Sequence, residues 1–210
     1  MSVNNAGAIA KTVANLVKSI PVRNKDVVSR RFGLKNGKKE TLESIGKSYG
    51  ITRERVRQIE EFAVNQLRKV ADGSSDVERY VVLAKNIIGG NSLPGQGVMK
   101  ERDLFKAFSG SEADSAVNSS LVFMLSISHD LVRFGENDDF HAFWAVSSEA
   151  LADFKNLFAS TVAFLEKSKK AVPEESFVAL AESNGVSGLA GNLKTCLSIS
   201  KTISKNIFHE

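Results

Sequence analysis

The stretch Thr41-Leu-Glu-Ser-Ile-Gly-Lys-Ser-Tyr-Gly-Ile-Thr-Arg-Glu-Arg-Val-Arg-Gln-Ile-Glu60 predicts two helices joined by a glycine turn. Thr41 and Thr52 stand where the N-cap of each helix would lie, because a threonine hydroxyl can accept a hydrogen bond from an otherwise unpaired N–H. Gly50 follows the first helix at a position suited to a positive φ angle. Gly46 lacks a Cβ atom and so allows the second helix to approach closely.

Apolar residues recur at helical spacing in both segments, so each predicted helix has one face suited to a core. These residues are Leu42, Ile45 and Tyr49 in the first helix, and Val56, Ile59 and Ala63 in the second. The other face of the second helix bears Arg53, Glu54, Arg57 and Gln58 near its N-terminal end. That end enters the DNA major groove in helix-turn-helix proteins, where Arg, Glu and Gln can pair with base edges. A merely solvated, charged face is the alternative, which the caps, the turn glycine and the inward stripe disfavour together.

Residues 23–70 resemble region 4 of the sigma-70 family, the module that recognises the promoter −35 element. The resemblance rests on Arg23, Val28-Ser-Arg-Arg-Phe-Gly-Leu34, Thr41-Leu-Glu-Ser-Ile-Gly46 and Ile51-Thr-Arg-Glu-Arg-Val-Arg-Gln-Ile-Glu60. It covers about a quarter of the chain, and the gap at 35–40 has the length that is usual in the family.

The resemblance implies a role for individual residues of this sequence. Arg53, Glu54 and Gln58 would contact bases. A second set would contact the phosphate backbone and fix the register, Leu42 through its main-chain amide. This second set consists of Arg23, Arg31, Thr41, Leu42, Lys47, Arg55 and Arg57. The family also docks this module on the flap of the RNA polymerase β subunit, so the polymerase core is an expected partner beside double-stranded DNA.

Charge is distributed unevenly along the 210 residues. Residues 1–70 hold 15 Lys and Arg against 6 Asp and Glu, whereas the remaining 140 residues hold 13 against 18. Eleven of the thirteen Phe residues lie beyond residue 70, enough for a separate core. We therefore expect a basic, DNA-binding helix-turn-helix domain at 1–72, a hinge at 72–75 and a mildly acidic remainder.

The expected fold class is mainly α, with a winged-helix-like second domain at 76–148 and a helical extension at 149–210. Helical patterns at 76–88, 100–108 and 112–125 precede two short apolar runs, Asp130–Phe134 and Phe140–Val146, which predict a β-hairpin. The acidic turn between these runs disfavours a contact with phosphates. We therefore expect this module to pack against protein or to space the domains. Further helices are expected at 149–170, from Pro173 and at 189–207, and the last resembles the lead-in to another helix-turn-helix domain, as if the chain were part of a longer protein.

The sequence shows no active-site pattern. Histidines are scattered without metal-ligand spacing, and neither a nucleophile elbow nor a phosphate-binding loop is present, so we expect no enzyme activity, cofactor or metal. The acidic turn with His141 is better interpreted as a solvated hairpin turn. Cys196 is interpreted as a buried small residue. With no apolar run near the roughly 20 residues needed to span a bilayer and no signal-peptide start, we expect a soluble, cytoplasmic, nucleoid-associated protein.

Three functions are compatible with these patterns. The first is a sigma-type transcription factor that recognises a −35-like element with RNA polymerase, although nothing resembles the part of sigma factors that melts the −10 element. The second is a dimeric repressor or activator with the same helix-turn-helix and a C-terminal interaction domain. The third, a nucleic-acid enzyme, would need catalytic residues that the sequence does not show.

Overall fold

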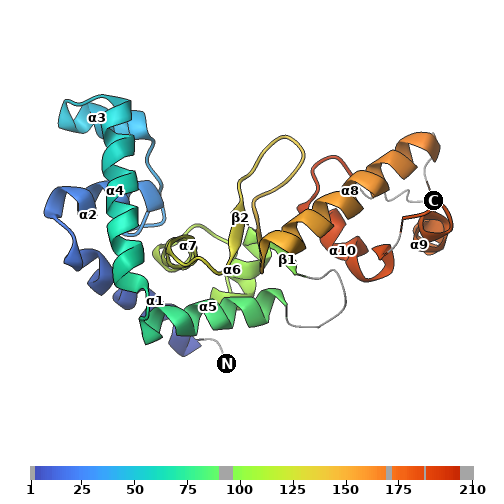
Figure 1. Ribbon diagram of the computed structural model, residues 1–210, viewed down its shortest axis with the longest axis horizontal. Coiled ribbons are helices and arrows are strands. Elements are labelled where there is room, and N and C mark those ends of the chain that lie inside the picture. The colour runs from blue at the N-terminus through green and yellow to red at the C-terminus, as the bar shows by residue number, and fades with distance from the viewer. Residues whose placement is uncertain (1–2, 90–96, 169–171, 187, 204–210) are drawn as a thin grey trace. The chain divides into compact units, whose positions relative to one another are not determined.

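The computed structural model describes residues 3–89, 97–168, 172–186 and 188–203, and its contacts divide the chain into two units. The first unit comprises residues 1–84 and 105–130, and the second comprises 85–104 and 131–210. Helices dominate both, with one small antiparallel sheet, so the expectation of a mainly α chain is confirmed (Figure 1). None of the described helices is long and apolar enough to cross a membrane.

The helices of the N-terminal 130 residues follow the sequence pattern closely. They are α1 (Val3–Leu16) with the 3-10 turn η1 (Val17–Ser19), α2 (Val22–Phe32), α3 (Leu42–Tyr49), α4 (Arg53–Ala71), α5 (Ser75–Ile88), α6 (Glu101–Ser109) and α7 (Ala116–Ile127). Helix α7 differs from the expectation, because it begins four residues later, at Ala116. Ser115 caps it there, because its hydroxyl accepts a hydrogen bond from the Asn118 N–H at 3.1 Å.

Helix α7 is buried along almost its whole length. It contains no charged residue, and Leu121 to Leu125 are all buried, as is expected of a helix that is surrounded by protein. Within the first unit it packs against α1, α2 and α4. Phe123 meets Phe32 of α2 edge to face, with ring centroids 5.0 Å apart. Helix α7 is therefore part of the core of the first unit.

The sheet contains three short strands, β1 (Val98–Lys100), β2 (Val132–Phe134) and β3 (Phe143–Ala145), in the order β1-β3-β2. Strands β2 and β3 form the expected hairpin, with Val132 opposite Ala145 and Phe134 opposite Phe143. Strand β1 was not expected. It adds the edge strand that completes the winged-helix order α5-β1-α6-α7-β2-β3 along the chain.

A buried carboxylate connects the three strands with the start of α6. Glu101 follows β1 directly and accepts hydrogen bonds from Arg133 Nε (2.6 Å) and Nη2 (2.8 Å) of β2. Its Oε2 also accepts a hydrogen bond from Trp144 Nε1 of β3 at 3.0 Å. A buried charge is costly unless it is paired and hydrogen-bonded, and Glu101 is both.

The second unit is built around aromatic side chains. Helices α8 (Ser148–Ser168), α9 (Glu174–Ser183) and α10 (Leu189–Ile199) share a core with the sheet, in which the rings of Phe140 and Phe158 lie 4.6 Å apart. Cys196 lies in this core, where burial raises the pKa of its thiol to about 11. Cys196 is therefore a buried core residue, as predicted.

The prediction that the last helix extends to residue 207 is wrong, because α10 ends at Ile199. Ser200 turns away to form a β-bridge with Phe140, and its hydroxyl accepts hydrogen bonds from the N–H groups of Thr202 and Ile203. Residues 90–96 and 204–210 lie outside the described residues.

The two units do not follow the expected domain boundaries at residues 72 and 148. The predicted hinge at 72–75 lies inside the first unit, and α7 joins helices that precede it by more than forty residues. Contacts that are distant in sequence decide these units. The boundaries that the sequence suggests stay a prediction about which pieces fold alone.

Candidate nucleic-acid interface

The turn between α3 and α4 has the backbone geometry that its glycines and threonines predict. Thr41 and Thr52 have extended backbones, and their hydroxyls accept hydrogen bonds from the N–H groups of Ser44 (3.1 Å) and Arg55 (3.2 Å). Gly50 ends α3 with a φ of 63°. A Cβ atom on Gly46 would lie 2.7 Å from the carbonyl oxygen of Ile51, so only glycine fits there without a shift of the backbone.

A small apolar core sets the angle between α2, α3 and α4. Val27, Ile45 and Val56 contribute one side chain from each helix, and all three are completely buried. Leu42, Tyr49, Ile51 and Ile59 pack around them. This core turns the opposite side of α4 outward, which is the side that bears the predicted base-contacting residues.

The predicted base-contacting residues Arg53, Glu54 and Gln58 are all exposed on the first two turns of α4. Arg53 has no hydrogen-bond or ion-pair partner among the described residues, so its guanidinium is available to a ligand. Glu54 lies in the first turn, where the helix dipole favours a negative charge. In helix-turn-helix proteins, the N-terminal residues of the second helix are the ones that contact base edges.

Glu54 is the centre of an intrahelical network on this exposed face. Its carboxylate accepts hydrogen bonds from Arg57 Nε (2.9 Å) and Nη2 (2.9 Å), and the nearby Arg57 guanidinium lowers the pKa of Glu54. Arg57 also pairs with Glu61 at 3.1 Å, and Arg55 donates to the Gln58 side-chain oxygen at 3.1 Å. Exposed pairs of this kind exchange easily with water, so the network orders these side chains without closing the face to a ligand.

The residues of the predicted phosphate set occupy different environments. Thr41, Lys47, Arg55 and Arg57 are exposed on α3 and α4, and Leu42 is half-buried at the start of α3. Arg23 is exposed on α2, and its guanidinium carbon lies 5.1 Å from the ring centre of Tyr49. Arg31 differs from the others, because its guanidinium is engaged inside the fold.

Arg31 connects two separate parts of the helix-turn-helix. Its Nε donates to Glu60 Oε2 on α4 at 2.9 Å, and its Nη1 donates to the main-chain oxygen of Glu40 at 2.6 Å. Its side chain is 28% exposed. Arg31 therefore links α2 with α4 and with the residue that precedes the N-cap of α3.

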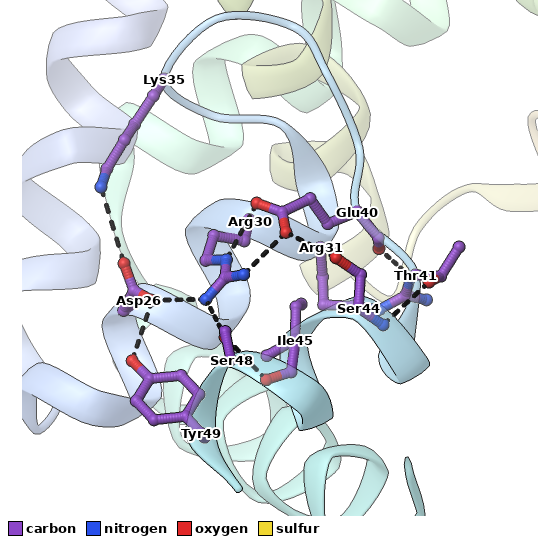
Figure 2. A network of polar contacts seen from close by, with 10 residues as sticks. All are labelled: Asp26, Arg30, Arg31, Lys35, Glu40, Thr41, Ser44, Ile45, Ser48 and Tyr49. Atoms are coloured by element: carbon purple, nitrogen blue, oxygen red, sulfur yellow. Dashed lines mark hydrogen bonds and ion pairs between the residues drawn. The ribbon is translucent and has the colours of Figure 1, made fainter.

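Figure 2 shows a polar network that the sequence did not reveal. Arg30 of α2 donates to both carboxylate oxygens of Glu40, at 2.9 and 2.7 Å, and also to Ser48 Oγ of α3 at 2.8 Å. Asp26 lies 3.6 Å from Arg30 Nη1 and accepts a hydrogen bond from the Tyr49 hydroxyl at 2.9 Å. Arg30 and Glu40 are ten positions apart, and no local spacing rule predicts such a contact.

The geometry defines a helix-turn-helix module with an exposed, arginine-bearing second helix. Residues 16–69 match the family model for sigma-70, region 4, which confirms the resemblance seen in the sequence. The match includes α2, α3 and most of α4 but excludes α7.

Sigma factors match the same part of the chain. The RNA polymerase principal sigma factor HrdD of Streptomyces coelicolor is 39% identical over 57 residues, which are 27% of this chain and 17% of that protein. The RNA polymerase sigma factor RpoS of Coxiella burnetii is 52% identical over 50 residues, 24% of this chain and 14% of that protein. The sigma factor SigA of a Bacillus species is 40% identical over 60 residues, 29% of this chain and 16% of that protein. The chain thus spans only about one sixth of the curated relatives that it matches.

Proposed function

We propose that the first unit binds duplex DNA through α3 and α4 and recognises a −35-like promoter element together with RNA polymerase. The observation that supports this most directly is the exposed N-terminal end of α4, with Arg53 unpaired beside Glu54 and Gln58. The match of residues 16–69 to region 4, and to proteins named as sigma factors, supports the same role. Such a protein would act on the nucleoid.

In this proposal the two sets of residues have different tasks. Arg53, Glu54 and Gln58 contact base edges in the major groove, where a good bidentate pair contributes about 1–3 kcal/mol of discrimination. Thr41, the Leu42 amide, Lys47, Arg55 and Arg57 contact phosphates, together with Arg23 beside Tyr49. The N–H groups at the start of α3 are suited to phosphate, because a helix N-terminus favours an anion.

One helix-turn-helix contacts only a few base pairs, so its selectivity as a lone monomer is small. Association with RNA polymerase near a promoter would raise the effective concentration of the module. We therefore propose the polymerase core, through the flap of its β subunit, as the partner. A pull-down of core RNA polymerase with the full chain, and promoter binding with and without the polymerase, test this part.

Arg53→Ala tests the base-contacting role. Duplexes are first selected from a random-sequence pool with the full chain, and binding is then measured by fluorescence anisotropy at fixed salt. We expect Arg53→Ala to lose about 1–3 kcal/mol on selected duplexes that contain the matched guanine, and much less when that base pair is changed. Arg79→Ala, which removes an arginine from α5, is the matched control for loss of charge. Equal losses on every duplex would contradict the base-contacting role.

A further inference from the structure

The residue before the N-cap of α3 is held on all of its polar groups. The N–H of Glu40 donates to the carbonyl oxygen of Arg30 at 2.9 Å, and its own carbonyl oxygen accepts from Arg31 Nη1 at 2.6 Å. Its carboxylate accepts both hydrogen bonds from Arg30 and a third from Ser44 Oγ at 3.2 Å. Two neighbouring arginines of α2 thus hold one glutamate, one by its side chain and the other by its main chain (Figure 2).

The same arginines also fix the far end of α3 and the body of α4. Arg30 reaches Ser48 in the last turn of α3, and Arg31 reaches Glu60 in α4. The side chains of Arg30 and Arg31 are only 21% and 28% exposed. A planar guanidinium that bonds a carboxylate with two parallel N–H groups specifies orientation as well as distance. The arrangement therefore restricts α3 in position and in rotation.

We infer that Arg30, Arg31 and Glu40 are positioning residues, which hold the N-terminus of α3 in place for a DNA phosphate and do not contact the DNA themselves. This inference rests on the proposed function. It assigns Arg31 a task other than the phosphate contact that the family resemblance implies, because its Nε and Nη1 already donate hydrogen bonds within the fold. It also gives a role to Glu40, an acidic residue in a surface that should attract a polyanion.

Removal of the Glu40 charge should change the DNA affinity in opposite directions, depending on whether Glu40 positions α3 or acts only through its charge. Removal of a negative charge from a DNA-binding surface should strengthen binding, because DNA is a polyanion. If Glu40 positions α3, its loss should weaken binding instead. Glu43 offers a matched control, because it is an acidic residue three positions further along the chain. Its side chain is 60% exposed, and its ion pair with Lys47 is long at 3.9 Å.

The experiment compares Glu40→Gln with Glu43→Gln in the full chain, using a duplex that the wild-type chain binds. We expect Glu40→Gln to lower the association constant by about five- to tenfold, the size expected for a lost charged hydrogen bond. Glu43→Gln should leave the association constant unchanged or raise it. Unchanged or stronger binding by Glu40→Gln would overturn the inference. A wild-type chain that bound no duplex at low salt would instead overturn the proposed function.

The salt dependence of binding distinguishes positioning residues from phosphate contacts. Each lost phosphate contact reduces the slope of log K against log salt concentration by about 1. We expect Lys47→Ala to reduce this slope, and Arg31→Ala to lower the affinity on every sequence with the slope unchanged. A reduced slope for Arg31→Ala would show that Arg31 contacts phosphate and would overturn its positioning role.

Arg30→Lys keeps the charge but loses the two parallel hydrogen bonds, so it decides the matter if Glu40→Gln fails to fold. Binding is measured at a temperature at which circular dichroism shows the variant to be folded. We expect weaker binding with an unchanged salt slope, and faster hydrogen exchange at the N–H groups of residues 42–44. Wild-type affinity for folded Arg30→Lys would refute the role of this pair.

Discussion

Helices α4 and α7 each come third in a run of helices of the kind found in DNA-binding folds, yet their surfaces differ in the structure. Helix α4 keeps one face of its first two turns exposed, with Arg53, Glu54 and Gln58 outward. Helix α7 occupies the third-helix position of the winged-helix order but is enclosed by α1, α2 and α4 of the first unit. The difference shows that the order of elements does not decide which helix keeps an exposed polar face. The chemistry of each helix surface does, since α4 is amphipathic and α7 is uncharged.

The first unit extends beyond the residues that match region 4. The matched segment ends at residue 69, but the first unit in this chain includes a helix from residues 116–127. Phe32, inside the match, contacts Phe123, outside it. In this chain, therefore, the core of the first unit includes a segment that the family match does not include.

The largest expected effect is that of Phe123→Ala, which tests how much α7 contributes to the stability of the first unit. Phe123 is completely buried, and Phe123→Ala should lower the free energy of unfolding of the first unit by about 3–5 kcal/mol because it leaves a cavity. Phe62→Ala, the same change at a residue of α4 that is 58% exposed, should alter it by less than about 0.5 kcal/mol. Urea unfolding followed by circular dichroism measures both. Similar small losses would mean that α7 is not part of the core of the unit.

The variant Gly37→Ala tests a second contact, between the matched segment and the start of α7. Its φ is 81°, and a Cβ atom there would lie 2.6 Å from the backbone nitrogen of Ser115, the N-cap of α7. Gly110 has a similar φ of 79° with open space around it. Both alanine variants meet the same left-handed strain, of about 1 kcal/mol, and Gly37→Ala should lose about 1–3 kcal/mol more through the clash.

The unfolding midpoints in urea of the two glycine variants give the result directly, because the strain term cancels in their difference. Equal midpoints would indicate that the loop at 33–40 is free to move away from residues 114–115. The contact would then contribute nothing to the module.

The smallest expected effect concerns pH and the positioning network around α3. The Arg30 guanidinium lowers the pKa of Glu40 below its ordinary value of 4.5. A carboxylate with a lowered pKa in the folded state stabilises the fold above its ordinary pKa, and this contribution disappears as the pH falls through the lowered value. Glu40 is 37% exposed, so the contribution is small.

We therefore expect the stability difference between the wild-type chain and Glu40→Gln to be constant near neutral pH and to shrink in acid. Urea unfolding of both proteins at a series of pH values measures it. A difference that grew toward acid pH would contradict the assigned direction of the pKa.

The sequence predicted the helix-turn-helix well because its signals are local. Caps, turn glycines and apolar spacing depend only on residues within one or two helical turns. Thr41, Gly50 and Thr52 have the predicted roles in the structure. The exposure of Arg53, Glu54 and Gln58 followed from the same periodicity. Burial of α7 was also readable in principle, because no charged residue occurs between Ala116 and Ile127.

Features that depend on tertiary contacts could not be predicted in this way. Strand β1 is only three residues long, too short for an alternating pattern to stand out. The contacts of Arg30 with Glu40 and of Arg31 with Glu60 span ten and twenty-nine positions. Arg30 and Arg31 are adjacent on α2, and the sequence does not indicate that Arg30 would bond Glu40 in a loop and Arg31 would bond Glu60 in α4. Long-range geometry decides these roles.

The position of Trp144 gives the chain a built-in optical label. It is the one tryptophan of the sequence, it lies in the second unit, and its indole donates to the buried carboxylate of Glu101. Both tyrosines, Tyr49 and Tyr80, lie in the first unit. Tryptophan emission should therefore report the melting of the second unit, and tyrosine absorbance should report that of the first unit, so both can be followed in one unlabelled sample.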